Sequence, residues 1–133
     1  MAECGRQLAV IIEIMSSKFE NLKAWQASRE LAVYCYKLTK NFPKSETFSL
    51  TNQILRSAIS ISANIAEGCS RSSKRDFERF LEIALGSSFE LETFMAISYD
   101  IGYIDLATKV ETDNRIRKCE KLINGPKRSL KNV

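Results

Sequence analysis

The chain has 133 residues, of which 44% are hydrophobic and 27% charged, and its formal net charge is +4. This length suits one domain that can bury about two-thirds of its unfolded surface, and the composition is ordinary for a soluble globular protein. Five glycines and two prolines are too few for the tight turns of an all-β fold, so the composition favours helices.

The first 18 residues are expected to be an extension ahead of the fold. The apolar run Leu8–Ile12 is too short to span a membrane, is soon followed by Glu13, and makes a poor signal peptide. Met15, followed by Ser-Ser-Lys, resembles a second possible translation start. We therefore expect residues 1–18 to be loosely held or disordered, with a short extra helical turn as the alternative, and we expect no membrane association.

A first long helix is predicted for residues 19–42. Its apolar and small residues recur at steps of three or four, close to a heptad pattern. They are Leu22, Trp25, Ser28, Leu31, Cys35, Leu38 and Phe42. Trp25, Tyr34 and Tyr36 could stack on nucleic-acid bases, but aromatic residues at helical spacing are far more often core. Pro43 pushes the residue before it out of the α region and ends this helix.

A second helix, residues 46–68, carries a polar line directly beside its apolar one. The polar line consists of Gln53, Arg56, Ser60, Asn64, Glu67 and Arg71. Short polar groups beside a core favour hydrogen bonds to a neighbouring helix, and an ordinary exposed face is the alternative of equal weight. Gly68 and the serine-rich residues after it predict a helix cap and a tight loop.

The third helix, which Ser72 or Ser73 is expected to cap, has the most regular heptad in the chain. Its seam positions are Phe77, Leu81, Ala84, Ser88, Leu91, Met95 and Ser98. Gly86 costs about 1 kcal/mol against Ala inside a helix, and a close approach by another backbone or a large side chain would explain it. Gly102 is the expected cap at the end of this helix.

The fourth predicted helix, residues 106–124, is the most basic and has the weakest apolar stripe. The stripe consists of Ala107, Val110, Ile116, Cys119, Leu122 and Ile123. Gly125 and Pro126 are expected to end the helix and leave residues 125–133 as a mobile basic tail. Residues 106–133 contain eight basic and three acidic residues. A segment of this kind can contact nucleic acid, although Lys and Arg also favour helix C-termini and solvated tails.

Four helices joined by short loops predict an all-α fold, an antiparallel up-down-up-down bundle spanning residues 19–124. A polar network is expected between the second and third helices, because small residues there would let the two backbones approach. Its members are Arg56, Ser60, Asn64, Glu67, Ser87 and Glu90. Within it we expect Arg56 to pair with Glu90 or Glu67, and Glu92 is a further candidate member.

The sequence lacks several of the residues and motifs that enzymes commonly use for catalysis. The chain contains no His, which removes the commonest general base, the Ser-His-Asp arrangement and the Glu-x-x-His pair of di-iron bundles. Four scattered cysteines form no CxxC pair, so we expect neither a metal nor another cofactor. Reduced cytoplasmic thiols are expected rather than disulfides.

The run from Gln53 to Gly68 resembles the signature of the four-helix-bundle proteins encoded in intervening sequences of bacterial 23S rRNA genes. Its Asn-Ile-Ala-Glu-Gly block, residues 64–68, is the most specific part. Supporting pieces occur in the family's order from residue 19 to residue 130, among them Phe42-Pro43, Ala84-Leu85-Gly86-Ser87 and Gly102-Tyr103. This chain departs from the family's pattern at Leu55, where an Arg is common, and at Ser62, where Pro is frequent.

The resemblance implies a bundle that assembles as a ring-like homopentamer, and it brings no catalytic residues. It also suggests a likeness to the accessory protein of diversity-generating retroelements, which binds nucleic acid and a reverse transcriptase through a basic surface. We therefore expect a non-enzymatic oligomer that binds structured RNA or DNA through symmetry-repeated basic residues. The candidates are Arg115, Arg117, Lys118, Lys121, Lys127 and Arg128. The alternatives are a scaffold that binds a protein partner and, third, a bundle with a small-molecule pocket.

Overall fold

The computed structural model describes Gly5 and residues 18–131, and side chains are described for residues 19–126. Residues 18–131 contain four α-helices, α2 (Lys23–Thr39), α3 (Leu50–Cys69), α4 (Lys74–Asp100) and α5 (Leu106–Lys131), and two short 3-10 turns, η1 (Lys18–Asn21) and η2 (Lys44–Glu46). No strand occurs in residues 18–131, so the predicted all-α class is confirmed. The predicted extension, residues 1–18, lies almost entirely outside the described residues.

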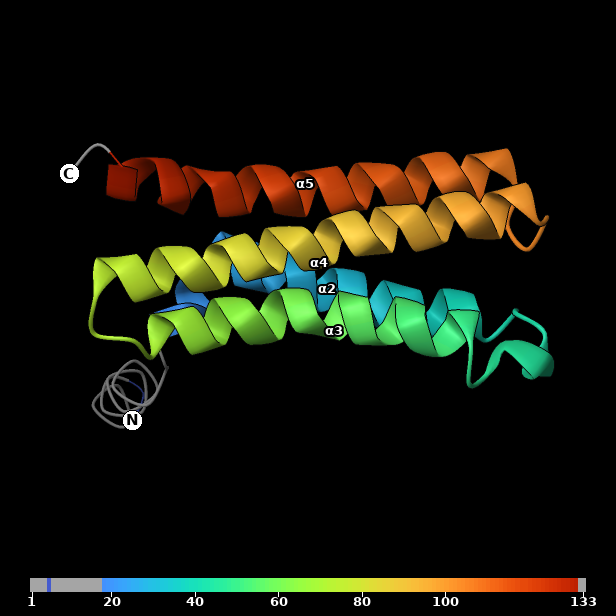
Figure 1. The fold of residues 1–133 in the computed structure, drawn as a ribbon, viewed down its shortest axis with the longest axis horizontal. Coiled ribbons are helices and arrows are strands. Elements are labelled where there is room, and N and C mark those ends of the chain that lie inside the picture. Colours follow the sequence, from blue (N-terminus) through green and yellow to red (C-terminus); the bar gives the residue numbers. More distant parts are fainter. Residues whose placement is uncertain (1–4, 6–17, 132–133) are drawn as a thin grey trace.

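The four helices lie side by side, and the chain turns back at each of the three connections between them (Figure 1). Each helix contacts its two neighbours in the order α2, α3, α4, α5, and α5 closes the circuit by contacting α2. The backbones of the diagonal pairs, α2 with α4 and α3 with α5, lie further apart, with no two Cα atoms within 8 Å. The α2–α5 face of the bundle therefore lies opposite the α3–α4 face.

The core follows the predicted heptads. Leu81, Leu91 and Met95 of α4 are buried, as are the small seam residues Ala84, Ser88 and Ser98. In α2 the seam positions Ser28, Leu31 and Cys35 are buried, and Trp25 is half-buried against them. Burial of this continuous stripe on each helix supplies the hydrophobic stabilisation that holds the bundle together.

Two of the predicted helix caps are confirmed. The Ser73 hydroxyl accepts a hydrogen bond from the backbone N–H of Asp76, 3.1 Å away, and so satisfies a free donor at the start of α4. Gly102 has φ +86°, the left-handed conformation that favours glycine after a helix.

The predicted cap at Gly68 is wrong, because α3 continues through this residue to Cys69. Gly68 is buried against the start of α4, and a Cβ built on it would lie 3.0 Å from Phe80 Cβ and 3.2 Å from Phe77 Cδ2. Glycine is needed here for close packing of two helices rather than for a turn. The close approach expected at Gly86 is absent among the described residues, because none of them lies within 4 Å of a Cβ built there.

The last helix differs from its prediction at both ends. Gly125 and Pro126 do not end it, since α5 continues to Lys131 with Pro126 inside. Proline removes one backbone donor, and the turns on either side still complete the helix. Ala107 and Val110, predicted to face the core, are exposed, and Thr112 is fully buried instead.

Candidate nucleic-acid interface

Four of the predicted basic residues lie along the exposed side of α5. Arg115, Arg117, Lys118 and Lys121 are all exposed, and the last three line one open hollow on this helix with Asn114 and Leu122. The other two candidates, Lys127 and Arg128, lie outside the described side chains, so their position stays a prediction.

The structure places part of α2 beside these residues. A larger open hollow of about 790 Å³ crosses from α2 to α5. Its lining consists of Gln26, Arg29, Glu30, Val33, Tyr34, Lys37 and Arg115. A small adjoining hollow adds Lys118. The basic residues of α5 therefore share one face with two basic residues of α2, Arg29 and Lys37.

Two of the arginines on this face stack on aromatic rings. The Arg115 guanidinium lies 4.4 Å from the ring centre of Tyr34, and that of Arg29 lies 5.5 Å from the ring centre of Trp25. Such stacking holds the planar guanidinium in place while it leaves N–H donors open to solvent. Tyr34 is itself fixed, because its hydroxyl lies 2.9 Å from that of buried Thr112, which donates to the Thr108 carbonyl.

The charge balance of this face is positive. Arg29, Lys37, Arg115 and Lys118 are opposed in the two hollows by Glu30 alone. Arg115 donates to Glu111 at 2.8 Å, an exposed pair of the kind that contributes little stability and can be exchanged for another anion. An anionic polymer laid along this face would meet several cations in succession. We call these four cations, with Trp25 and Tyr34, the basic α2–α5 face.

The sequence prediction missed Arg29 and Lys37. They lie eight residues apart on the outer side of α2, a spacing of about two turns, so they share one side of that helix. That spacing was visible, but nothing in the sequence showed that α5 would be the neighbour across the groove. The helical spacing of Trp25 and Tyr34 favours a place in the core over a role in base stacking. In the structure both rings are half-buried, and each lies beneath an arginine guanidinium.

Part of the predicted polar network between α3 and α4 is present. The hydroxyls of Ser60 and Ser87 lie 2.8 Å apart, and the Asn64 amide donates to Ser60 Oγ at 2.9 Å and to the Ser60 carbonyl at 2.8 Å. Ser87 lies 3.1 Å from the Ile83 carbonyl. Every donor is used once if Asn64 donates to Ser60, Ser60 to Ser87, and Ser87 to Ile83. This directed chain links α3 to α4, the two helices that share the most extensive contact in the bundle.

The charged members of that network are not brought together. Arg56 and Glu90 are exposed and form no salt bridge with any described residue, and Glu67 pairs with Arg71, which lies just beyond the end of α3. The expected pairing of Arg56 with Glu67 or Glu90 is therefore wrong. Arg71 follows Glu67 by four residues, just past the last turn of α3, and so lies within easy reach of its carboxylate, whereas Arg56 lies three turns away along the helix.

A different carboxylate interaction occurs between α4 and α5. Glu120 of α5 faces Glu92 and Ser88 of α4, and partial burial together with the Glu92 carboxylate raises the pKa of Glu120 to about 8. Hydrogen bonding from Ser88 and the charge of Arg117 oppose this rise. Two neighbouring carboxyl groups in a partly desolvated site resist being ionised together, so one proton is retained near neutral pH.

Other types of site receive no structural support. Within residues 18–131, no cluster of three or more Cys, Asp or Glu residues could hold a metal ion. None of the helices in this range combines the length and the apolar character required to cross a bilayer.

The sequence profile of the family described as "23S rRNA-intervening sequence protein" matches residues 20–125. The chain belongs to this family. The matched residues run from the turn before α2 into the last turns of α5, so they contain the whole basic α2–α5 face. The intervening-sequence resemblance found at residues 53–68 is thereby confirmed.

A crystal structure supports the family fold. The chain is similar to a protein of unknown function from the S23 ribosomal protein family of Bacteroides thetaiotaomicron, with 30% sequence identity and a TM-score of 0.73. The similarity covers 78% of this chain and 97% of that one. No curated protein matches the chain. The intervening-sequence family thus accounts for the bundle, and the basic α2–α5 face has to be interpreted from its own chemistry.

Proposed function

We propose that the protein is a non-enzymatic, cytoplasmic, antiparallel four-helix bundle that assembles into a homopentamer and binds structured RNA or DNA. The observation that carries the proposal is the basic α2–α5 face, where four cations outnumber the carboxylates of Glu30 and Glu111 and two arginines stack on aromatic rings. Phosphate backbones supply most of the affinity of proteins that bind nucleic acid without strong sequence preference. Exposed arginines are suited to this role because they bind phosphate in a bidentate manner.

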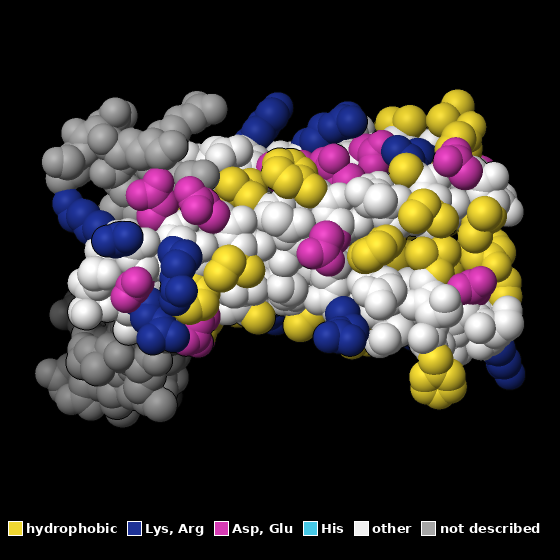
Figure 2. Space-filling model, viewed as in Figure 1, with side chains coloured by type: hydrophobic (Ala, Val, Ile, Leu, Met, Phe, Trp, Pro, Cys, Tyr) yellow, Lys and Arg dark blue, Asp and Glu magenta, His cyan; other side chains and the backbone are white. Residues whose placement is uncertain are grey.

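The opposite face supports self-association. Ile59 of α3 and Ile83 and Ile97 of α4 are each more than 40% exposed, and the two α4 residues are two heptads apart and so share a side of the helix. Figure 2 shows hydrophobic side chains gathered over the C-terminal half of α4 and the first turns of α5. Arg56 and Glu90, exposed and without salt bridges, offer opposite charges to a second copy. Gly86 leaves room there for a close approach.

This division of faces is compatible with a ring. Subunits that associate through α3 and α4 leave α2 and α5 free, because the two pairs lie on opposite sides of the bundle. Cyclic symmetry would then repeat the basic α2–α5 face around the ring, and each copy would add its cations to the same surface. Cys35 and Cys119 form no disulfide within the described part of the chain, which supports a reducing compartment.

The experiment is a filter-binding titration of structured RNA and of duplex DNA across salt concentrations. The test variant carries Arg29→Glu with Lys37→Glu. The control variant carries Arg75→Glu with Arg79→Glu, the same charge change on exposed residues of α4 that lie among Asp76, Glu78 and Glu82. We expect wild type and control to bind at low salt with a steep salt dependence. The test variant should bind more weakly, with a slope of log K against log salt that is about two units smaller.

Absence of affinity at low salt, or equal losses in the two variants, would contradict the proposal. A partner captured by pull-down that survives nuclease treatment would instead favour the scaffold function. The solution mass tests the assembly separately, and we expect about five times the chain mass of 15.1 kDa.

A further inference from the structure

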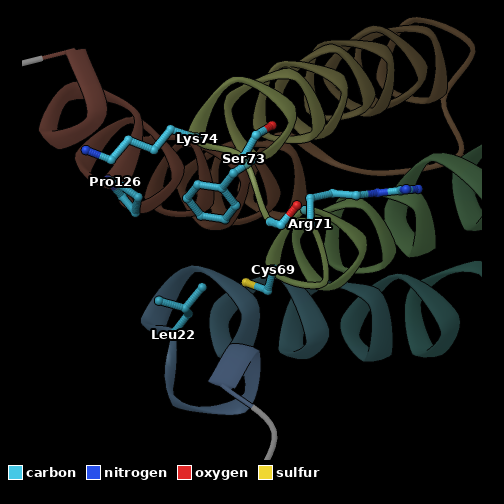
Figure 3. A pocket seen from close by; sticks show the side chains of 9 residues that line it. Leu22, Cys69, Arg71, Ser73, Lys74 and Pro126 are labelled. Atoms are coloured by element: carbon cyan, nitrogen blue, oxygen red, sulfur yellow. The ribbon is translucent and has the colours of Figure 1, made fainter. Parts of the chain in front are cut away.

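One end of the bundle contains a hollow of about 360 Å³. It is formed by Leu22, the residue before α2, together with the end of α3, the start of α4 and the last turns of α5. Its lining includes Leu22, Gly68, Cys69, Phe77 and Pro126. Figure 3 shows Leu22 and Cys69 on one side of this space and Pro126 on the other.

The surface of this hollow is mostly apolar. Leu22, Phe77 and Pro126 present carbon atoms, and Gly68 has no side chain. The Arg71 side chain extends away from the hollow in Figure 3, pairs with Glu67 and lies over the ring of Phe80. The chemistry therefore fits an aliphatic occupant better than an anion.

The chain itself supplies such an occupant at this end. Leu22, which lines the hollow, directly follows η1, so the residues before η1 must start from the same end of the bundle. Residues 8–15 read Leu-Ala-Val-Ile-Ile-Glu-Ile-Met, with one charged residue among eight. The seven residue-to-residue steps from Met15 to Leu22 can span at most about 25 Å, so this run stays within reach of the hollow.

We infer that residues 8–15 of the same chain cover the hollow between Leu22, Cys69, Phe77 and Pro126 and insert aliphatic side chains into it. A tethered segment of this kind has a high effective concentration at the site, which gives it an advantage over any free ligand or second copy. The segment would thus close the open end of the bundle core with its own apolar residues. The inference is independent of nucleic-acid binding, because the basic α2–α5 face takes no part in it.

Cys69 provides a reporter for the test, because its sulfur points into the hollow in Figure 3 and the side chain is only half-buried. The measurement is the rate of alkylation of Cys69 by a maleimide in the full chain carrying Cys4→Ser. Cys35 and Cys119 are buried, and burial raises their pKa values to about 12 and about 11, so their thiols react slowly.

The test variants are Ile11→Asp and Ile12→Asp, and Gln7→Asp is the matched control with the same charge change outside the apolar run. Charged residues should not remain in an apolar hollow, so we expect each test variant to be alkylated at Cys69 at least 10-fold faster than the parent chain. The control should react at the parent rate. Equal rates in the parent and the Ile variants would overturn the inference. Retained helicity by circular dichroism shows that an increased rate reports uncovering rather than unfolding.

A cross-link identifies which chain supplies the segment. In the Cys4→Ser background, Ile12→Cys should form a disulfide with Cys69 under mild oxidation. Mixing isotope-labelled and unlabelled chains distinguishes the possibilities by mass spectrometry of the linked peptides. Links within one chain support the inference. Links only between differently labelled chains would assign the hollow to a second copy, and absence of a link would also overturn the inference.

Discussion

The packing of α3 against α4 makes a quantitative prediction at Gly68. Replacing this glycine with alanine removes backbone freedom from the unfolded chain and adds helix propensity, which together favour the variant by at most about 1 kcal/mol. The new methyl group would lie 3.0 Å from Phe80 Cβ and 3.2 Å from Phe77 Cδ2. Phe80 Cβ cannot rotate away, because it is bonded directly to the α4 backbone, so the two helices must separate.

Overpacking of this kind costs about 1–3 kcal/mol, which exceeds the propensity gain. We therefore expect Gly68→Ala to lower the free energy of unfolding by about 1–2 kcal/mol and the melting temperature by about 4–8 °C. Gly86→Ala is the matched control, because nothing lies within 4 Å of a Cβ built at Gly86. That variant should be more stable than wild type by about 0.5–1 kcal/mol.

The assay is urea unfolding followed by circular dichroism at one low protein concentration, since self-association would raise the apparent stability. Sedimentation of the same samples shows that they are monomeric. A Gly68→Ala variant as stable as wild type, with an unchanged m-value, would refute the claim that α3 and α4 touch at this residue. A loss at Gly86 as large as that at Gly68 would refute it equally.

Three further predictions concern self-association, pH and a buried hydroxyl. Ile97→Asp should reduce the solution mass from the oligomer to the single chain while helicity is retained, and an unchanged mass would contradict the proposed α3–α4 interface. Because Glu92 and burial raise the pKa of Glu120 from 4.5 to about 8, the folded state binds this proton more tightly, and its stabilising effect is lost as pH rises from about 5 to 8. Glu120→Gln should remove that decline in urea titrations across pH, whereas a decline as steep as in wild type would show that another group causes it. Tyr34→Phe removes the hydrogen bond to Thr112 and should lower the free energy of unfolding by about 1 kcal/mol, with no loss expected if that bond is not formed in solution.

Features that depend on periodicity within one helix, such as which residues are buried, were predicted correctly from the sequence. The heptad of α4 placed Leu81, Leu91 and Met95 in the core because a repeat of 3.5 residues keeps one side of a helix facing its neighbours. The hydrogen bond between Ser60 and Ser87 also followed from pattern, since small polar residues lay beside the apolar line on both helices.

Features that depend on packing between helices could not be predicted. Thr112 is fully buried while Val110 is half-exposed, because the threonine hydroxyl donates to the Thr108 carbonyl and meets Tyr34 of α2. Hydropathy alone predicts the opposite order. The contribution of Arg29 to the candidate site likewise depended on which helix lies next to α5. Pro126 was interpreted as a helix stop, yet a single missing donor did not prevent the last turns of α5 from forming.

Photochemical cross-linking of bound RNA most directly tests the claim that the basic α2–α5 face contacts nucleic acid. The complex is irradiated at low salt, and the cross-linked peptides are identified by mass spectrometry. The account predicts links on peptides of α2 that contain Trp25 or Tyr34 and on peptides of α5 around Arg115. Links confined to α3 and α4, on the opposite side of the bundle, would contradict it.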